Sequence, residues 1–219
     1  MFYEVENELK SIEAILLIGP TSAGKTPLGD HIQQRGIRGR RCHHFDFGHE
    51  LRSISAMQEP FPEFSPEEHA FIRDVLDKGR LLEDDHFSLA EKILRRFLAE
   101  RGWEEPDLII LNGLPRHAGQ ARDMEQLVTI THLLALDCCV EDVRARIERN
   151  SGGDRTFRTD DSEEMVREKL ALYAQRTAPL MEYYSAKGCR LAALCVDAAA
   201  SPESLYAQLL PLLFPEDDV

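Results

Sequence analysis

Residues Gly19 to Thr26 have the types and the spacing of a phosphate-binding loop. The pattern Gly-x-x-x-x-Gly-Lys-Thr occurs within the stretch LIGPTSAGKTPLGDHI. Its glycines allow backbone N–H groups to converge on phosphate oxygens, and a helix that begins at the loop adds positive potential. Lys25 supplies a mobile charge for the outer phosphates, and the Thr26 hydroxyl is a ligand for Mg²⁺. A plain glycine turn is the alternative, but the apolar run before the loop and the helical pattern after it favour phosphate binding.

Chemistry of this kind also needs a carboxylate at the end of a neighbouring strand, which holds Mg²⁺ or its waters. The candidate strand is DLIILN, residues 107–112, and it ends in Asn112. Asparagine can orient a metal-bound water but brings no charge. We therefore expect weaker binding of Mg²⁺ than a carboxylate at this position would give.

Cationic side chains accompany the loop. Neutralisation of charge on moving oxygens dominates phosphoryl transfer, so clustered arginines are expected near the site. A polar, glycine-containing segment, residues 150–161, carries arginines inside it and on both sides. A basic segment in an acidic chain indicates a lid that closes on polyphosphate, whereas solvated surface arginines are the alternative. The candidates are Arg52, Arg116, Arg146, Arg149, Arg155, Arg158, Arg167 and Lys169.

Apolar runs that alternate with helical text must position these residues. This alternation predicts an α/β fold with a five-stranded parallel sheet whose strands are buried on both faces. The expected strands are residues 14–19, 42–47, 107–112, 131–138 and 189–196. The expected helices are residues 27–35, 48–57, 65–78, 84–100, 116–127, 141–149, 201–213 and a long helix over 162–184 that Pro179 should kink or interrupt.

Composition limits the classes of function. The chain of 219 residues carries a net charge of -13, which argues against non-specific binding to nucleic acid. No apolar run approaches the ~20 residues of a membrane-spanning helix, and the acidic N-terminus lacks the order of a signal peptide. We interpret the five cysteines as buried free thiols, and we expect a cytoplasmic monomer with neither nucleic acid nor membrane as a partner.

Several motifs, in one order from about residue 14 to 213, resemble the adenylate kinase or nucleoside monophosphate kinase family. GPTSAGKT stands at the family's phosphate loop, FGHELR resembles its Thr-Gly-Asp-x-x-Arg segment, and NGLPRHAGQA resembles Asp-Gly-Phe-Pro-Arg-x-x-x-Gln. DKGRLLEDD and FRTDDSEEMVREKLALYAQRTAPLMEYY resemble the family's segments after the monophosphate-binding helices and at the lid exit.

The resemblance implies a single domain with a three-layer α/β/α P-loop fold. Its core would comprise residues 14–47, 80–149 and 162–213. A helical monophosphate-binding insertion would span about 48–79 and a short lid about 150–161. Residues 1–13 would form an N-terminal arm. The lid lacks the cysteine cluster that some relatives use for zinc.

The resemblance also implies a role for each matching residue. ATP phosphates, with Mg²⁺, would bind the loop of Gly19, Ser22, Ala23, Gly24, Lys25 and Thr26, with Thr26 at the metal. Arg146 would lie against the ATP base, while Lys25, Arg116, Arg158 and Lys169 would act on the transferred phosphate. The monophosphate would bind Phe47, Arg52, Arg116 and Gln120, with Gln120 reading its base.

The chain departs from the family pattern at several of these positions. Thr21 and Ser22 replace a proline and a glycine of the loop, which is tolerable if the backbone torsions survive. His49 and Asn112 replace the two aspartates expected to organise the magnesium water shell, and Lys169 replaces a lid arginine. Asp46, Asp84 or Asp85 could compensate for the lost acids.

The resemblance implies an ATP-dependent kinase, with AMP the favoured acceptor because of Gln120. UMP, CMP and GMP remain open, since Phe47 weakens the inference. Two alternatives also remain. The first is a catalytically weakened nucleotide-binding protein that serves as a sensor or a partner-binding module. The second is a P-loop kinase for another small acceptor. Because in-line transfer needs no protein nucleophile, none is expected.

Overall fold

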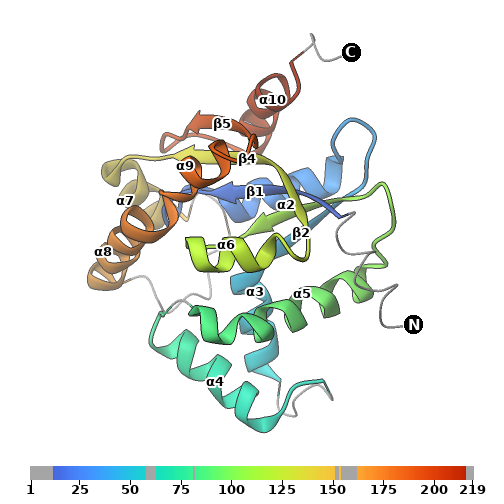
Figure 1. Ribbon diagram of the computed structural model, residues 1–219. Coiled ribbons are helices and arrows are strands. Elements are labelled where there is room, and N and C mark those ends of the chain that lie inside the picture. Colours follow the sequence, from blue (N-terminus) through green and yellow to red (C-terminus); the bar gives the residue numbers. More distant parts are fainter. Residues whose placement is uncertain (1–11, 58–62, 81, 151–152, 154–161, 216–219) are drawn as a thin grey trace.

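A five-stranded parallel sheet forms the centre of the molecule (Figure 1). The computed structural model describes residues 12–57, 63–80, 82–150, 153 and 162–215. The strands are β1 (Glu13–Ile18), β2 (Cys42–Asp46), β3 (Leu108–Asn112), β4 (Thr129–Asp137) and β5 (Arg190–Cys195), in the order β2-β3-β1-β4-β5. The predicted parallel α/β fold is confirmed, and each strand begins and ends within two residues of its predicted position.

The register of the three strands at one end of the sheet brings their carboxyl ends together. Leu17 of β1 pairs with Asn112 of β3, and Asn112 pairs with Asp46 at the end of β2. Side chains and loops that follow these strands therefore meet at a single edge, where parallel α/β sheets bind their ligands.

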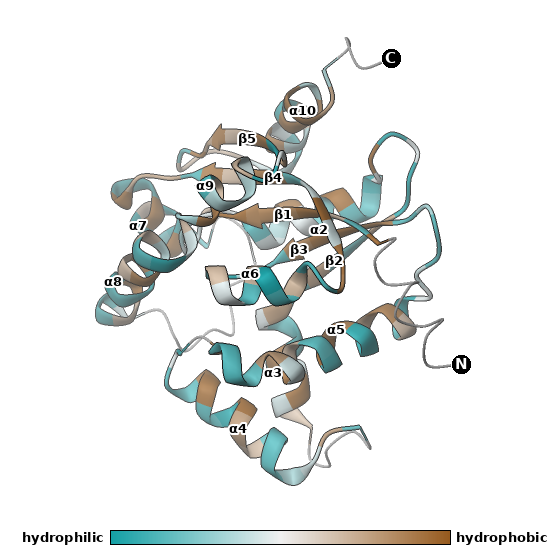
Figure 2. Ribbon diagram, in the orientation of Figure 1, coloured by the Kyte–Doolittle hydropathy of each residue, from teal (hydrophilic) through white to brown (hydrophobic). Residues whose placement is uncertain are grey.

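Helices cover both faces of the sheet because successive strand residues point to opposite sides. Ile15 and Leu17 belong to a core shared with α2 (Lys25–Arg35) and α10 (Pro202–Leu213). Leu16 and Ile18 belong to a second core, to which α5 (Phe87–Arg101), α6 (Ala118–Met124) and α9 (Leu180–Ser185) contribute. Brown strands between helices with teal outer faces show this layering in Figure 2.

Two helices extend beyond the sheet on the side of α5 (Figure 1). They are α3 (Phe47–Ala56), which follows β2 directly, and α4 (Pro66–Asp77), which packs on α3. Asp46 caps α3 by accepting a hydrogen bond from the His49 N–H, and Ser65 with Glu68 forms a capping box at α4. A short 3₁₀ turn, Asp84–His86, leads from this region into α5.

The segment predicted as one long helix is divided. It consists of α8 (Glu163–Leu172), a π-helical turn (Tyr173–Thr177) and α9. The Ala178 N–H bonds to the Tyr173 carbonyl at 2.9 Å, which spans five residues. Pro179 follows at once and has no N–H to continue the helical pattern, so the predicted interruption at this proline is confirmed. Before α8, α7 (Val140–Arg149) follows β4.

Two predictions about burial are wrong in part. β5 is an edge strand with alternating exposure, so Leu191 and Cys195 face solvent instead of a core. Cys139 is exposed as well, because it caps the start of α7. Cys42 and Cys138 are buried and Cys189 is half-buried, and all five cysteines are free.

Residues 1–11 of the predicted arm and all of the predicted lid except Asn150 and Gly153 lie outside the described residues. Within the part of the chain that the structure describes, no helix combines the length and the apolar character needed to cross a membrane.

Candidate active site

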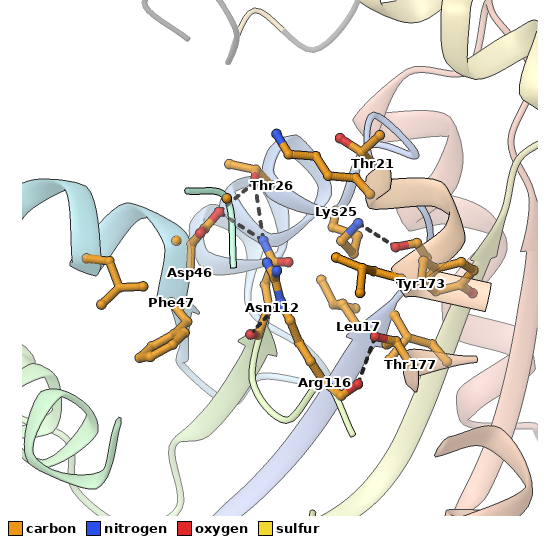
Figure 3. Close-up of a pocket in the computed structure, with 18 of the residues that line it drawn as sticks. Leu17, Thr21, Lys25, Thr26, Asp46, Phe47, Asn112, Arg116, Tyr173 and Thr177 are labelled. Carbon is orange, nitrogen blue, oxygen red and sulfur yellow. Dashed lines mark hydrogen bonds between the residues drawn. The ribbon is translucent and has the colours of Figure 1, made fainter. Parts of the chain in front are cut away.

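A cavity lies at the carboxyl ends of β1, β2 and β3, between the phosphate loop, α3, the end of α4 and the π-helical turn (Figure 3). It brings together most of the predicted site residues from separate parts of the chain. These are Gly19, Ser22, Gly24, Lys25, Thr26, Phe47, Arg52, Arg116, Gln120, Arg146 and Lys169. Ala23 is fully buried beneath the loop, and Arg158 lies outside the described residues.

The phosphate loop has the backbone that its glycines predict. A Cβ on Gly19 would lie 2.7 Å from the Leu136 carbonyl oxygen, so only glycine fits there. Gly24 has a φ of 90° and leads directly into α2. Ser22, the replacement for a family glycine, retains a left-handed φ of 62°. The serine therefore adopts a left-handed torsion that glycine would adopt more easily.

The Lys25 side chain lies along the loop itself. Its Nζ donates hydrogen bonds to the carbonyl oxygens of Gly19 and Pro20, each at 2.7 Å. A phosphate that enters the loop offers stronger, charged acceptors to the same ammonium group. The lysine is thus held in place at the mouth of the loop.

A carboxylate lies beside Thr26, although it comes from β2 and not from β3. Asp46 Oδ2 accepts hydrogen bonds from Thr26 Oγ1 at 2.6 Å and from Asn112 Nδ2 at 2.9 Å (Figure 3). Burial, the largest single influence, raises the pKa of Asp46, but the hydrogen bonds from Thr26 and the His49 N–H, together with the Arg52 guanidinium, outweigh it and hold the pKa below its ordinary value. Asp46 is therefore ionised at neutral pH.

Asn112 is 4% exposed, and neighbouring side chains orient its amide. Its Nδ2 also lies 3.2 Å from Thr26 Oγ1 and 3.4 Å from His44 Nε2. The other ring nitrogen of His44 lies 2.8 Å from Asp30 Oδ1. If that nitrogen carries the proton donated to Asp30, Nε2 is left as the acceptor for the Asn112 amide.

His43, His44 and His49 are close in sequence but are not placed together as metal ligands. His43 lies on the opposite face of β2 from His44 and pairs with Asp107 at 2.7 Å, as the alternation along a strand predicts. Among the described residues, no group of three or more His, Cys, Asp or Glu side chains is placed to hold a metal ion. Magnesium bound with a nucleotide needs fewer protein ligands, because phosphate oxygens and waters fill its shell. The Thr26 hydroxyl and the Asp46 carboxylate are hard oxygen groups that suit it.

The opposite wall of the cavity carries the predicted monophosphate residues. A Cβ on Gly48 would lie 3.3 Å from an Arg52 guanidinium nitrogen, and one on Gly113 would lie 3.3 Å from Arg116. Arg116 Nε bonds to the Gly113 carbonyl at 3.0 Å, and its own carbonyl accepts from the Thr177 hydroxyl at 2.9 Å. Both arginines line the cavity, and the bond from Nε to the Gly113 carbonyl orients the Arg116 guanidinium.

Gln120 is in the cavity wall, but its amide is already engaged. Its Oε1 accepts from the Arg116 N–H at 2.8 Å, and its Nε2 donates to the Leu82 carbonyl at 2.9 Å. The side chain is 1% exposed. A bound base would have to share or displace these bonds, so reading of a base by Gln120 stays a prediction.

Arg146 has a structural contact that the sequence does not reveal. It is 3% exposed, and it donates to the carbonyls of Ser22 at 2.9 Å, Asp197 at 3.0 Å and Ala200 at 3.1 Å. It therefore fastens the phosphate loop to the segment between β5 and α10. Lys169 lines the cavity, whereas Arg167 pairs with Glu163 at 3.3 Å on the exposed side of α8.

Several other lining residues have no role assigned from the sequence. Asp46 is named among three possible acids, but no motif selects it. Others belong to segments that resemble the family, although the resemblance gives them no individual role; they include Arg80, Tyr173 and Thr177.

A Gly-Lys-Thr loop at the end of a central parallel strand, facing a second wall of arginines, defines a P-loop phosphotransferase. No family model matches the sequence. Several curated proteins are similar to it over most of its length. The chain is 30% identical over 203 residues to the adenylate kinase of Thermus thermophilus, covering 90% of this chain and 95% of that one. It is also 30% identical over 208 residues to the adenylate kinase of Synechococcus sp., covering 90% and 96%.

A third relative is UMP-CMP kinase 1 of Oryza sativa subsp. japonica. It is 27% identical over 183 residues, covering 82% of this chain and 66% of the rice protein. The chain belongs to the adenylate kinase-like family of nucleoside monophosphate kinases, and it is a phosphotransferase.

Proposed function

We propose that this kinase transfers the γ-phosphate of ATP to AMP and forms two molecules of ADP. The observation that supports this most is the set of residues that line the cavity described above, which has cationic groups on two facing walls. One wall is a phosphate loop with Lys25 and Thr26, and the other carries Arg52 and Arg116. Two anionic substrates can thus face each other across a site that already holds the cationic groups needed to bind them.

In this proposal the residues position the substrates and neutralise charge. Lys25 exchanges its bonds to the loop carbonyls for bonds to the outer phosphates of ATP. Arg52 and Arg116 hold the acceptor phosphate, and Arg158 and Lys169 approach the transferred group from the lid side. The guanidinium of Arg146, whose edges are bonded to carbonyls, offers a flat face to the ATP base.

Magnesium would be held at the Thr26 hydroxyl, beside the Asp46 carboxylate. When bound with ATP, it neutralises phosphate charge that develops during transfer. Thr26 and Asp46 already lie within hydrogen-bond distance of each other, so the protein presents these oxygens together.

AMP is proposed as the acceptor because Gln120 occupies the position of the family's base-reading residue, and because relatives named adenylate kinase cover most of the chain. A pyrimidine monophosphate is the second candidate. The bonds that already occupy the Gln120 amide weaken the argument for adenine. The likeness to a protein named UMP-CMP kinase supports the pyrimidine.

We also propose a monomeric enzyme in the cytoplasm. Both walls of the cavity are built by a single copy of the chain, so the proposed reaction needs no second subunit. Free thiols suit a reducing compartment. Light scattering after gel filtration, with and without nucleotides, tests the oligomeric state: a dimer that forms under assay conditions would refute the monomer.

A coupled assay of ADP formation tests the proposed reaction with AMP, CMP, UMP, GMP and dAMP, each with Mg²⁺ and with Mn²⁺. We expect turnover with AMP, and a loss of roughly 100-fold or more in Arg116→Ala. Arg122→Ala, an exposed arginine on the adjoining helix, is the matched control and should keep wild-type rates. ATP binding that depends on Lys25, without turnover of any monophosphate, would instead support a nucleotide-binding module or another acceptor.

A further inference from the structure

Asp46 lies where the site lacks the two acids expected from the family pattern. We propose that Asp46 is the residue that positions magnesium and its waters in this kinase, replacing the missing acids at His49 and Asn112. The proposal rests on the proposed use of MgATP. It moves the metal-organising carboxylate from the end of β3 to the end of the adjacent strand β2.

The first support is the contact with Thr26. The Thr26 hydroxyl donates a hydrogen bond to Asp46 Oδ2 at 2.6 Å. Because its hydrogen points toward Asp46, the hydroxyl oxygen keeps a lone pair that can bind a cation in the cavity. Asp46 thus orients the metal ligand as well as supplying negative charge, which is how carboxylates behind metal ligands act.

The second support is the relation between Asp46 and Asn112. The strand register pairs these two residues, and Asn112 Nδ2 donates to Asp46 Oδ2 at 2.9 Å. An aspartate at position 112 would place two carboxylates at this separation, and like charges so close cannot both ionise easily. An amide at 112 is the neutral donor that a carboxylate at 46 needs. The aspartate at 46 and the asparagine at 112 therefore complement each other and leave one negative charge at the ends of β2 and β3.

The other candidate acids are placed elsewhere. Asp84 lies 3.3 Å from His117 and against Gly119, and neither Asp84 nor Asp85 lines the cavity. His49 contributes its backbone N–H to Asp46 Oδ1 at 2.9 Å, and it lies on the exposed side of α3. Among the described residues, Asp46 is the acid that lines the cavity.

The test measures metal affinity directly. Mn²⁺ is titrated into protein kept in excess over ATP, so that little ATP is left to bind the metal in solution, and free Mn²⁺ is followed by electron paramagnetic resonance. Asp46→Asn keeps a side chain that can cap α3, so the fold should persist. We expect this variant to bind Mn²⁺ about 10-fold more weakly or worse, while its affinity for ATP without metal, measured by calorimetry, does not fall. Asp85→Asn removes an exposed acid outside the cavity and should match the wild type.

An exchange variant, Asp46→Asn with Asn112→Asp, makes the test sharper because it returns the single carboxylate to β3. We expect it to recover Mn²⁺ affinity to within about threefold of the wild type, because a carboxylate again lies beside the Thr26 hydroxyl. Wild-type Mn²⁺ affinity in Asp46→Asn would overturn the inference, and so would an exchange variant that is folded by circular dichroism but no better than Asp46→Asn.

These outcomes separate the inference from the proposed function. If wild-type protein phosphorylates AMP while Asp46→Asn binds Mn²⁺ normally, the proposed function stands and the role of Asp46 falls. If wild-type protein does not bind ATP at all, both fall together.

Discussion

Ser22 carries a local conflict within the phosphate loop. It adopts a left-handed φ of 62°, which costs a residue with a Cβ about 1–2 kcal/mol. Its hydroxyl oxygen is buried without a hydrogen-bond partner among the described residues. The loop can carry this strain because Arg146 donates a hydrogen bond to the Ser22 carbonyl at 2.9 Å. Gly19 and Gly24, near the two ends of the loop, adopt the other positive φ angles.

Ser22→Gly should therefore stabilise the protein in the absence of nucleotide. Relief of the left-handed strain outweighs the extra freedom of glycine in the unfolded chain, so we expect unfolding in urea to cost about 1 kcal/mol more. Ser22→Ala removes the hydroxyl but keeps the Cβ, so it should recover only part of this gain. A Ser22→Gly variant less stable than Ser22→Ala would contradict the assignment of strain to the backbone.

At the scale of elements, the stability of α3 and α4 bears on the wall of the cavity that we propose binds the acceptor. α3 carries Arg52, and α4 packs on α3. The start of α4 depends on a capping box: the Glu68 N–H bonds to Ser65 Oγ at 3.2 Å, and the Ser65 N–H bonds to Glu68 at 2.8 Å. Lys92 of α5 ties the same glutamate to the core at 2.6 Å. We infer that these contacts set the position of the acceptor wall.

Ser65→Ala should lower the unfolding free energy by about 1 kcal/mol. If helices α3 and α4 form the monophosphate-binding unit, KM for the monophosphate should also rise about fivefold, the factor equivalent to ~1 kcal/mol, with KM for ATP unchanged. Ser201→Ala is the matched control, since Ser201 and Ser204 form the same capping box at α10 on the other side of the sheet. An equal rise of monophosphate KM in both variants would show a global effect and contradict the local one.

At the scale of the whole molecule, the sheet joins the two binding walls. β1 leads into the phosphate loop, while β2 and β3 lead into α3 and the loop of Arg116, and the register aligns all three ends. Ligands that bind the folded cavity stabilise the entire fold by mass action. If each wall binds its own ligand, as proposed, the two contributions to stability should be separable.

Thermal unfolding with nucleotides tests this separation. ATP or AMP at about 100 times its dissociation constant should add ~2.7 kcal/mol, which raises Tm by roughly 5–10 °C for a protein of this size. Lys25→Met should lose the shift from ATP and keep that from AMP, and Arg116→Ala should do the reverse. Loss of both shifts in either variant would mean that the walls do not bind independently.

The local features of this protein could be read from the sequence because they depend on neighbours along the chain. The phosphate loop, the buried strands, the capped start of α4 and the break at Pro179 each follow from a short pattern of glycine, proline or apolar residues. The lack of an acid at Asn112 was equally visible. The consequence of this missing acid could not be read from the sequence, because it depends on Asp46, the residue that pairs with Asn112 on the adjacent strand.

Tertiary structure decided the contacts between distant segments. The register of β2 against β3 brings Asp46 to Thr26 and Asn112, whose positions lie 20 and 66 residues away. Packing of α7 makes Arg146, the residue expected at the ATP base, a clamp on the loop as well, and the buried Gln120 amide is already hydrogen-bonded. Hydrogen-bond partners of buried polar groups are chosen by which segments the core forces together, and no local pattern encodes that choice.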